Sequence, residues 1–317
     1  MKFVGVAALT ALAVTAMTAP AGAQTTTVVL GTATPGGGFA RYAAPLVEIL
    51  NQVEPALLIE PRSTKGSTDT IPLLEAGQLD IGLVAGEPAY QAFEGIGRPR
   101  SELKIIGAMY SMAGMFVVRA ESPYRTIADL KAKPIAFGAR SSGLVVLARN
   151  VLDGMGLDAD KDFQAVYLDR AGDGTAMIMD GRVVALWGGG IGWPGFTAVA
   201  QAPGGARFIV PDAGERARIR AKQPQLQEIT IPAGSLPGQT APITSVGSWS
   251  FILARRTLDD DVAYKLARAL HRGHDALAAR LGEARETTPA NTAAAAPRAE
   301  LIHPGALRYL REAGMIR

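Results

Sequence analysis

The fold of this chain is set by the stretch Val28-Val29-Leu30-Gly31-Thr32-Ala33-Thr34-Pro35-Gly36-Gly37-Gly38-Phe39-Ala40-Arg41-Tyr42. An apolar, β-branched run leads into a glycine-rich centre, and apolar residues recur at helical spacing after it. This order predicts a strand, a loop and a helix. Glycines permit close approach of the backbone, and a helix start offers free N–H groups to an anion. The loop is therefore either one half of a ligand site or an ordinary connector.

The composition indicates a compact protein of two domains. Of the 317 residues, 48% are hydrophobic and 19% are charged, which is typical of folded chains. The formal net charge is +3, and arginine and lysine are scattered, so we expect no nucleic-acid partner. The absence of cysteine excludes thiol nucleophiles, thiolate metal sites and a lipidated N-terminal cysteine.

Residues 1–23 have the pattern of a cleavable secretory signal peptide. Lys2 precedes an apolar run from Phe3 to Met17, and the segment ends in Ala21-Gly22-Ala23. The run is shorter than the roughly 20 residues of a membrane-spanning helix. We expect cleavage after Ala23, with a retained anchor as the alternative, and export to the periplasm as a soluble protein.

Strands and helices alternate along the chain, which indicates a largely parallel α/β sheet. Separate strands are expected at 104–109 and 115–119, one amphipathic helix over 259–281, and a loop over 287–297. The strand at 248–254 is expected to cross back to the first domain.

The alternation repeats in the second half. Residues 73–84 resemble residues 177–187, since each segment has a helix end, a glycine, a polar residue and a buried strand. The similarity indicates two equivalent halves, or chance likeness between generic α/β units. We predict two α/β domains facing a ligand cleft, with domain I at 24–118 plus 247–317 and domain II at 119–246.

Catalytic and cofactor motifs are missing from the sequence. No G-x-S-x-G element occurs, and the first glycine loop has neither a P-loop lysine nor G-x-G-x-x-G spacing. His271 and His274 are three residues apart on the expected helix, so they could share a metal, but no third ligand is evident and a solvated helix surface explains them as well. We therefore predict a binding protein without cofactor or metal, rather than an enzyme.

The second glycine loop offers the chemistry for an anion. Arg140-Ser141-Ser142-Gly143 supplies a cation, two hydroxyls and helix-start N–H groups, which suit a carboxylate. The alternative is that Ser141 only caps the following helix. Arg41 either complements this loop from the first one or is an ordinary exposed arginine. Trp187, before Gly188-Gly189-Gly190, is either a ligand wall or core, and Phe39 presents the same choice.

Several of these motifs, in this order, carry a family resemblance over the whole mature chain. The chain resembles the solute-binding subunits of TRAP transporters of the TAXI class. The resemblance rests on Gly31–Glu48, Gly66–Tyr90, Phe137–Leu157, Pro237-Gly238-Gln239, Leu301–Ala306, Tyr309 and Gly314.

The resemblance implies a type II periplasmic binding-protein fold. Such a monomeric protein would close on a small organic acid, an amino acid or another carboxylate, and deliver it to a TRAP membrane permease driven by an ion gradient. The ligand-binding positions implied are Thr32, Gly38, Phe39, Glu87, Arg140, Ser141, Ser142, Gly143, Trp187, Gly188 and Gly189.

Three departures from the family pattern shift the expected ligand. Phe39-Ala40, Ala85-Gly86 and Leu144 stand where members often carry hydrogen-bonding side chains. We therefore expect a less polar organic acid, held by hinge closure with Arg140 as its main charged partner. Two alternatives remain: a sensory protein that presents its ligand to a membrane receptor, and an exported hydrolase.

Overall fold

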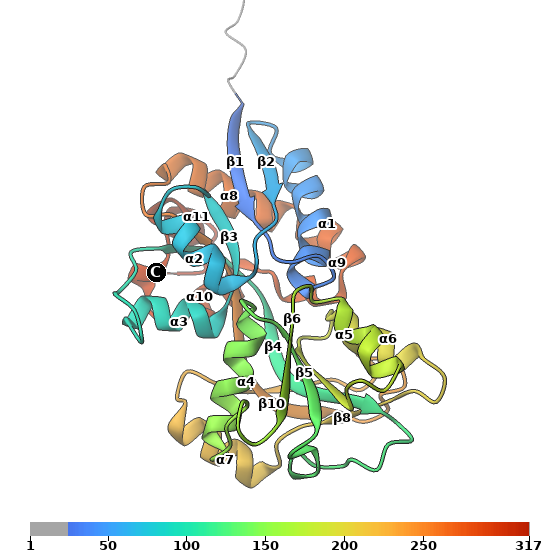
Figure 1. Ribbon diagram of the computed structural model, residues 1–317. Helices are drawn as coiled ribbons and strands as arrows, with labels where there is room; N and C mark the ends of the chain where they lie inside the picture. The colour runs from blue at the N-terminus through green and yellow to red at the C-terminus, as the bar shows by residue number, and fades with distance from the viewer. Residues whose placement is uncertain (1–24, 317) are drawn as a thin grey trace, which may run out of the picture.

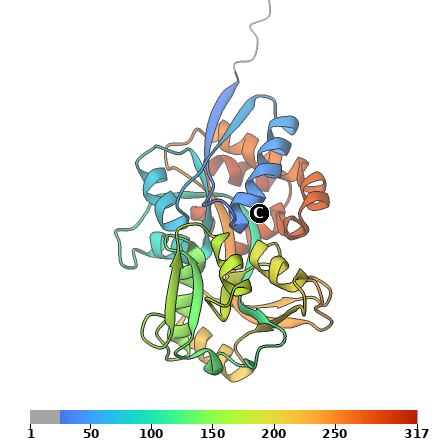
Figure 2. The ribbon, with the colours of Figure 1, turned by 45° about the vertical axis from the view of Figure 1, so that its right-hand side comes forward.

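The computed structural model describes residues 25–316, so the expected signal peptide at 1–23 lies outside the described residues. The chain forms two α/β lobes, one above the other in Figure 1. Both ends of the described chain, blue and orange to red, build the upper lobe, and the green and yellow middle builds the lower one (Figures 1 and 2).

The upper lobe, lobe I, contains a parallel three-stranded unit and most of the helices. Strand β1 pairs with β2 and β3 in parallel. Its elements are β1 Thr26–Gly31, α1 Gly38–Val53, β2 Leu57–Arg62, α2 Ser67–Glu75, β3 Ile81–Ala85, α3 Gly86–Glu94, α8 Asp260–Arg272, α9 His274–Arg280, η2 Gly282–Glu286, α10 Pro289–Ala295, η3 Ala299–Leu301 and α11 Pro304–Glu312.

The lower lobe, lobe II, repeats the parallel unit with β5 between β6 and β7. Its elements are η1 Ala128–Leu130, β5 Pro134–Ala139, α4 Gly143–Gly154, β6 Gln164–Leu168, α5 Asp173–Met179, β7 Ala185–Gly189, α6 Pro194–Gln201, β8 Ala206–Ile209, α7 Ala213–Lys222 and β9 Gln227–Ile231.

Two long antiparallel strands join the lobes. Strands β4, Lys104–Arg119, and β10, Ile243–Ala254, pair with each other from Lys104 to Ala113. In lobe I, β10 pairs with β3. In lobe II, β4 pairs with β7 and β8, and β10 pairs with β9. The strand order β2-β1-β3-β10-β4-β7-β5-β6 is therefore continuous through both lobes. The expected domain changes, at 118/119 and 246/247, fall within these two strands.

In each parallel unit one strand is buried on both faces, which explains its continuous apolar run. All residues of β3 and of β7 are buried. In lobe I the apolar faces of α1 and α8 cover one side of the sheet, and α2 and α3 contribute to the core on the other. In lobe II, α4 and α7 contribute to one core and α5 and α6 to the other.

Three expectations about elements are wrong. The strands expected at 104–109 and 115–119 are one strand, because β10 and β7 pair with the segment between and beyond them. The helix expected over 259–281 divides at Gly273 into α8 and α9, with Gly273 packed close to Ile49. The loop expected over 287–297 contains α10, which begins after Thr288, the side-chain cap of its first turn.

Among residues 25–316, no helix combines the length and hydrophobicity needed to cross a membrane.

We predict that Gly114→Ala destabilises the junction of the lobes. A Cβ on Gly114 would lie 2.6 Å from Cζ2 of the buried Trp187. Overpacking of this kind should lower the free energy of unfolding by about 1–3 kcal/mol, measured by urea denaturation. Gly282→Ala is the control, because nothing lies within 4 Å of the added methyl group. Equal stabilities of the two variants would contradict this packing account.

Candidate functional site

A cavity lies between the lobes, where the parallel strands of both units end. It leaves about 590 Å³ free of protein atoms, partly open to solvent. Ligands of open α/β sheets bind beyond the carboxyl ends of the strands, and this cavity has that position in both lobes at once. Its lining consists of Ala33, Thr34, Gly37, Gly38, Phe39, Lys65, Gly66, Ser67, Ala85, Tyr110, Met112, Gly138, Ala139, Ser142, Gly143, Leu144, Ala171, Gly189 and Trp193.

Three helices begin at the cavity wall. The first residues of α1, α2 and α4 are Gly38, Ser67 and Gly143, and all three line the cavity. The N-caps of α1 and α2 are Gly37 and Gly66, so no side chain accepts a hydrogen bond from the first turn of these two helices. Helix starts carry partial positive charge, and their convergence favours an anion in the cavity.

The two lobes contact each other along one side of the cavity. Thr68 of α2 donates through its N–H and its hydroxyl to the carbonyl of Ser141, at 3.2 and 3.0 Å. Gly36 approaches Gly172 so closely that a Cβ on Gly36 would lie 2.7 Å from the Gly172 backbone. Gly36 has φ +81°, a conformation that favours glycine. The two lobes are thus in direct contact on this side of the cavity.

Part of the cavity wall is apolar and aromatic. The Phe39 and Tyr110 rings meet edge to face at 6.2 Å, and Tyr110 packs on Tyr42 at 5.3 Å. Trp193, from the loop after β7, adds an indole that is 7% exposed and packs on Phe196. The cavity lining therefore combines helix starts with aromatic rings.

Lys65 is the charged residue of the lining, and no aspartate or glutamate stands among the lining residues. It follows β2 and is exposed, in the loop that leads to α2. The backbone N–H of Lys65 donates a hydrogen bond to the carboxylate of Asp69 at 2.9 Å. Among the lining residues, the side-chain charge of Lys65 and the partial charges of the helix starts are therefore both positive.

Five of the positions expected from the sequence line the cavity. They are Gly38, Phe39, Ser142, Gly143 and Gly189. Ser142, rather than Ser141, caps α4, since its hydroxyl accepts from the N–H of Leu144 at 3.2 Å.

Five other expected positions lie near the cavity without lining it. Thr32 is buried against the carbonyl of Arg62, and Gly188 packs under the Trp193 ring. Trp187 is core, fully buried, with its indole N–H donating to the Leu144 carbonyl at 2.8 Å. Ser141 uses its carbonyl for the contact with Thr68. Arg41 forms an ion pair with Glu283.

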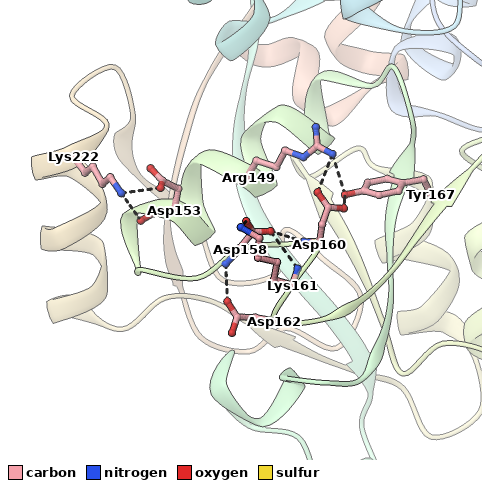
Figure 3. A network of polar contacts seen from close by, with 8 residues as sticks. All are labelled: Arg149, Asp153, Asp158, Asp160, Lys161, Asp162, Tyr167 and Lys222. Carbon is pink, nitrogen blue, oxygen red and sulfur yellow. Dashed lines mark hydrogen bonds and ion pairs between the residues drawn. The ribbon is translucent and has the colours of Figure 1, made fainter.

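Arg140 does not line the cavity and is exposed on lobe II. Its guanidinium lies over the Tyr167 ring, 5.1 Å from the ring centre. The Tyr167 hydroxyl donates to Asp160 at 2.5 Å and accepts from Arg149 at 3.2 Å, within the polar network of Figure 3. Arg140 would have to leave this ring to reach a ligand in the cavity.

Glu87 is buried directly behind the wall, in the first turn of α3. Neither of its carboxylate oxygens has a hydrogen-bond partner among the described residues. Burial raises the pKa of Glu87 to about 7, because it disfavours the charged form. Glu87 is therefore a carboxyl group poised to change its charge near neutral pH.

The histidines are separate from the site. His271 belongs to α8 and contacts the Tyr309 hydroxyl, whereas His274 begins α9. Within residues 25–316, no group of three or more metal-ligating side chains gathers at one place.

Sequence reasoning missed Lys65, Ser67, Tyr110, Met112 and Trp193. A local pattern does mark Lys65 and Ser67, because Gly66 between them stands between a strand and a helix, as the glycines of the other two loops do. Tyr110 and Met112 come from β4, whose course between the lobes depends on long-range pairing, so no local pattern marks them.

Comparison with known proteins gives a family match and solved structures with a similar fold. Residues 30–314 match the NMT1-like family. A protein from Bordetella bronchiseptica RB50 shares 13% identity over 92% of this chain and 98% of its own, with a TM-score of 0.57. A periplasmic transporter shares 14% identity over 77% of this chain and 81% of its own, with a TM-score of 0.51. The periplasmic aliphatic sulphonate binding protein SsuA from Escherichia coli shares 24% identity over 90% of this chain and 83% of its own, with a TM-score of 0.49.

The expected fold class is confirmed: two α/β lobes with crossing strands form a type II periplasmic binding-protein fold. The narrower resemblance to the TAXI class stays a prediction.

We predict that Glu87 makes stability depend on pH between its unfolded and folded pKa values, 4.5 and about 7. In this interval the folded protein keeps a proton that the unfolded chain releases, so the free energy of unfolding should fall as pH rises. The full effect is about 3 kcal/mol. Glu87→Gln removes the titration, so its stability relative to the parent should increase over this interval in urea denaturation. Parallel pH profiles of parent and variant would contradict the assignment.

Proposed function

We propose that this chain, which belongs to the NMT1-like family, is a periplasmic solute-binding protein for a small organic anion. The observation that carries the proposal is the convergence of the α1, α2 and α4 starts on one cavity between two lobes. The family and the binding-protein fold support a role in ligand capture. Helix starts and Lys65 favour negative charge in the ligand.

The polar and apolar lining residues describe the ligand further. Its anionic group would lie against Ser67, Ser142 and the Gly143 N–H, with Lys65 at the mouth. Its apolar body would contact the rings of Phe39 and Trp193 and the side chain of Leu144. Since the lining carries no carboxylate to pair with an ammonium group, we favour a carboxylate without an amine over an amino acid.

The transport step would follow from closure of the lobes. Residues 24–118 plus 247–317 would act as one body and residues 119–246 as the other, moving about β4 and β10. The closed monomer would then deliver its ligand to a membrane permease, for which we keep the TRAP type suggested by the sequence. The expected signal peptide supports periplasmic localisation.

A thermal-shift screen tests the function. A ligand that binds the folded state raises Tm, by mass action on the folding equilibrium. We expect medium-chain and aromatic monocarboxylates to raise Tm more than the matched α-amino acids or the matched amines. A screen in which organic anions leave Tm unchanged would contradict the proposal.

The two candidate cations are separated by paired variants. Lys65→Met should weaken binding of the best carboxylate by about 1 kcal/mol or more, the scale of a charged hydrogen bond, measured by calorimetry. Arg140→Met should change the affinity little, since Arg140 lies over Tyr167. The opposite result would restore Arg140 as the charged partner that the sequence suggests.

A further inference from the structure

We infer that Arg41 and Glu283 are a positioning pair that holds the two lobes closed by capturing the loop of Gly192 and Trp193. The inference rests on the proposed function, because closure matters only if the cavity binds a ligand. It assigns to Arg41 a role different from the direct ligand contact considered for it above.

The pair connects the lobes through a single loop. Arg41, on α1, and Glu283, on η2, both belong to lobe I and form an ion pair. The same Nη1 atom of Arg41 donates to the carbonyl of Gly192 in lobe II, at 3.2 Å. Gly192 also packs on the Glu283 carboxylate, which occupies the space that a Cβ at position 192 would need. Arg41 is therefore shared between its own lobe and the opposite one.

Burial of Glu283 ties its carboxylate to Arg41. The Glu283 side chain is 4% exposed, while the Arg41 side chain is 40% exposed. A nearly buried carboxylate needs a partner, so Glu283 fixes the direction of the arginine, and the arginine presents its N–H to the carbonyl across the cleft. A lysine at position 41 would lack the fixed planar geometry in which Nη1 of the guanidinium reaches both acceptors.

The pair is adjacent to the ligand wall on both sides. Phe39, two residues before Arg41, lines the cavity from lobe I, and Trp193, next to Gly192, lines it from lobe II. The Trp193 N–H is held by the Gly190 carbonyl at 3.2 Å, so the loop moves as one turn. The Trp193 ring is packed within lobe II on Phe196, so capture of Gly192 holds the lobe that carries this ring against α1.

The Thr68–Ser141 contact is a second, independent cross-lobe contact. It belongs to the α2 and α4 starts, whereas the Arg41 contact belongs to α1 and the loop after β7. Loss of Arg41 should thus release one side of the cleft without unfolding either lobe.

Distance measurement between spin labels tests the inference without any ligand. The chain has no cysteine, so Arg220→Cys on α7 and Arg311→Cys on α11, both exposed, place one label on each lobe. In this labelled parent we expect a population at the short distance that the structure shows, besides an open population. Arg41→Met and Glu283→Gln should each reduce the short-distance population in favour of the longer distance, and their combination should reduce it no further than Arg41→Met alone.

Arg280→Met is the matched control, since Arg280 pairs with Glu48 on the same helix α1 but entirely within lobe I. It should leave the distance distribution unchanged, and Arg41→Lys should restore the short distance only in part. Urea denaturation checks that each variant remains folded. A labelled parent without the short-distance population, or an Arg41→Met distribution equal to the parent's, would overturn the inference.

The proposed function and the positioning pair are tested by different measurements. The proposed function is contradicted if no organic anion raises Tm, whatever the label distances are. The role of the positioning pair is contradicted by the label distances alone. If both hold, Arg41→Met should also increase the dissociation rate of the best carboxylate from the thermal-shift screen, measured by stopped-flow fluorescence of the tryptophans.

Discussion

The antiparallel pairing of β4 with β10 is the interaction on which the rest of this structure depends. Each strand contributes hydrogen bonds to both lobes, so the two parallel units share one continuous strand order. Strand β4 also carries Tyr110 and Met112, which line the cavity. The strand that joins the lobes is thus also part of the cavity wall.

The direction of the parallel strands then decides the charge of the cavity. In both lobes the strands end at the cleft and the following helices begin there, so partial positive charges meet in the middle. A protein built in this way can attract an anion with few charged side chains. Lys65 at the mouth adds to a field that the backbone already provides.

The sequence predicted the fold well because its signals are local. Apolar runs, glycine loops and helical periodicity are read within about ten residues, and they place the loops at Gly37 and Gly138 on one cleft. Side-chain direction is not a local property. Nothing near Arg140 shows that it turns onto Tyr167, and nothing near Trp187 shows that its indole N–H bonds the Leu144 carbonyl in the core. The strand β4 likewise continues past Ser111 because of partners far along the chain.

The contact of Gly36 with Gly172 has a consequence for the thermodynamics of capture. Closing two surfaces usually immobilises side chains, and each rotamer-rich side chain costs roughly 0.5–1.5 kcal/mol of entropy on binding. Gly36 and Gly172 have no side chains, so the contact between these two residues forms without fixing any side-chain rotamer. More of the free energy of contact with a bound molecule can then appear as affinity.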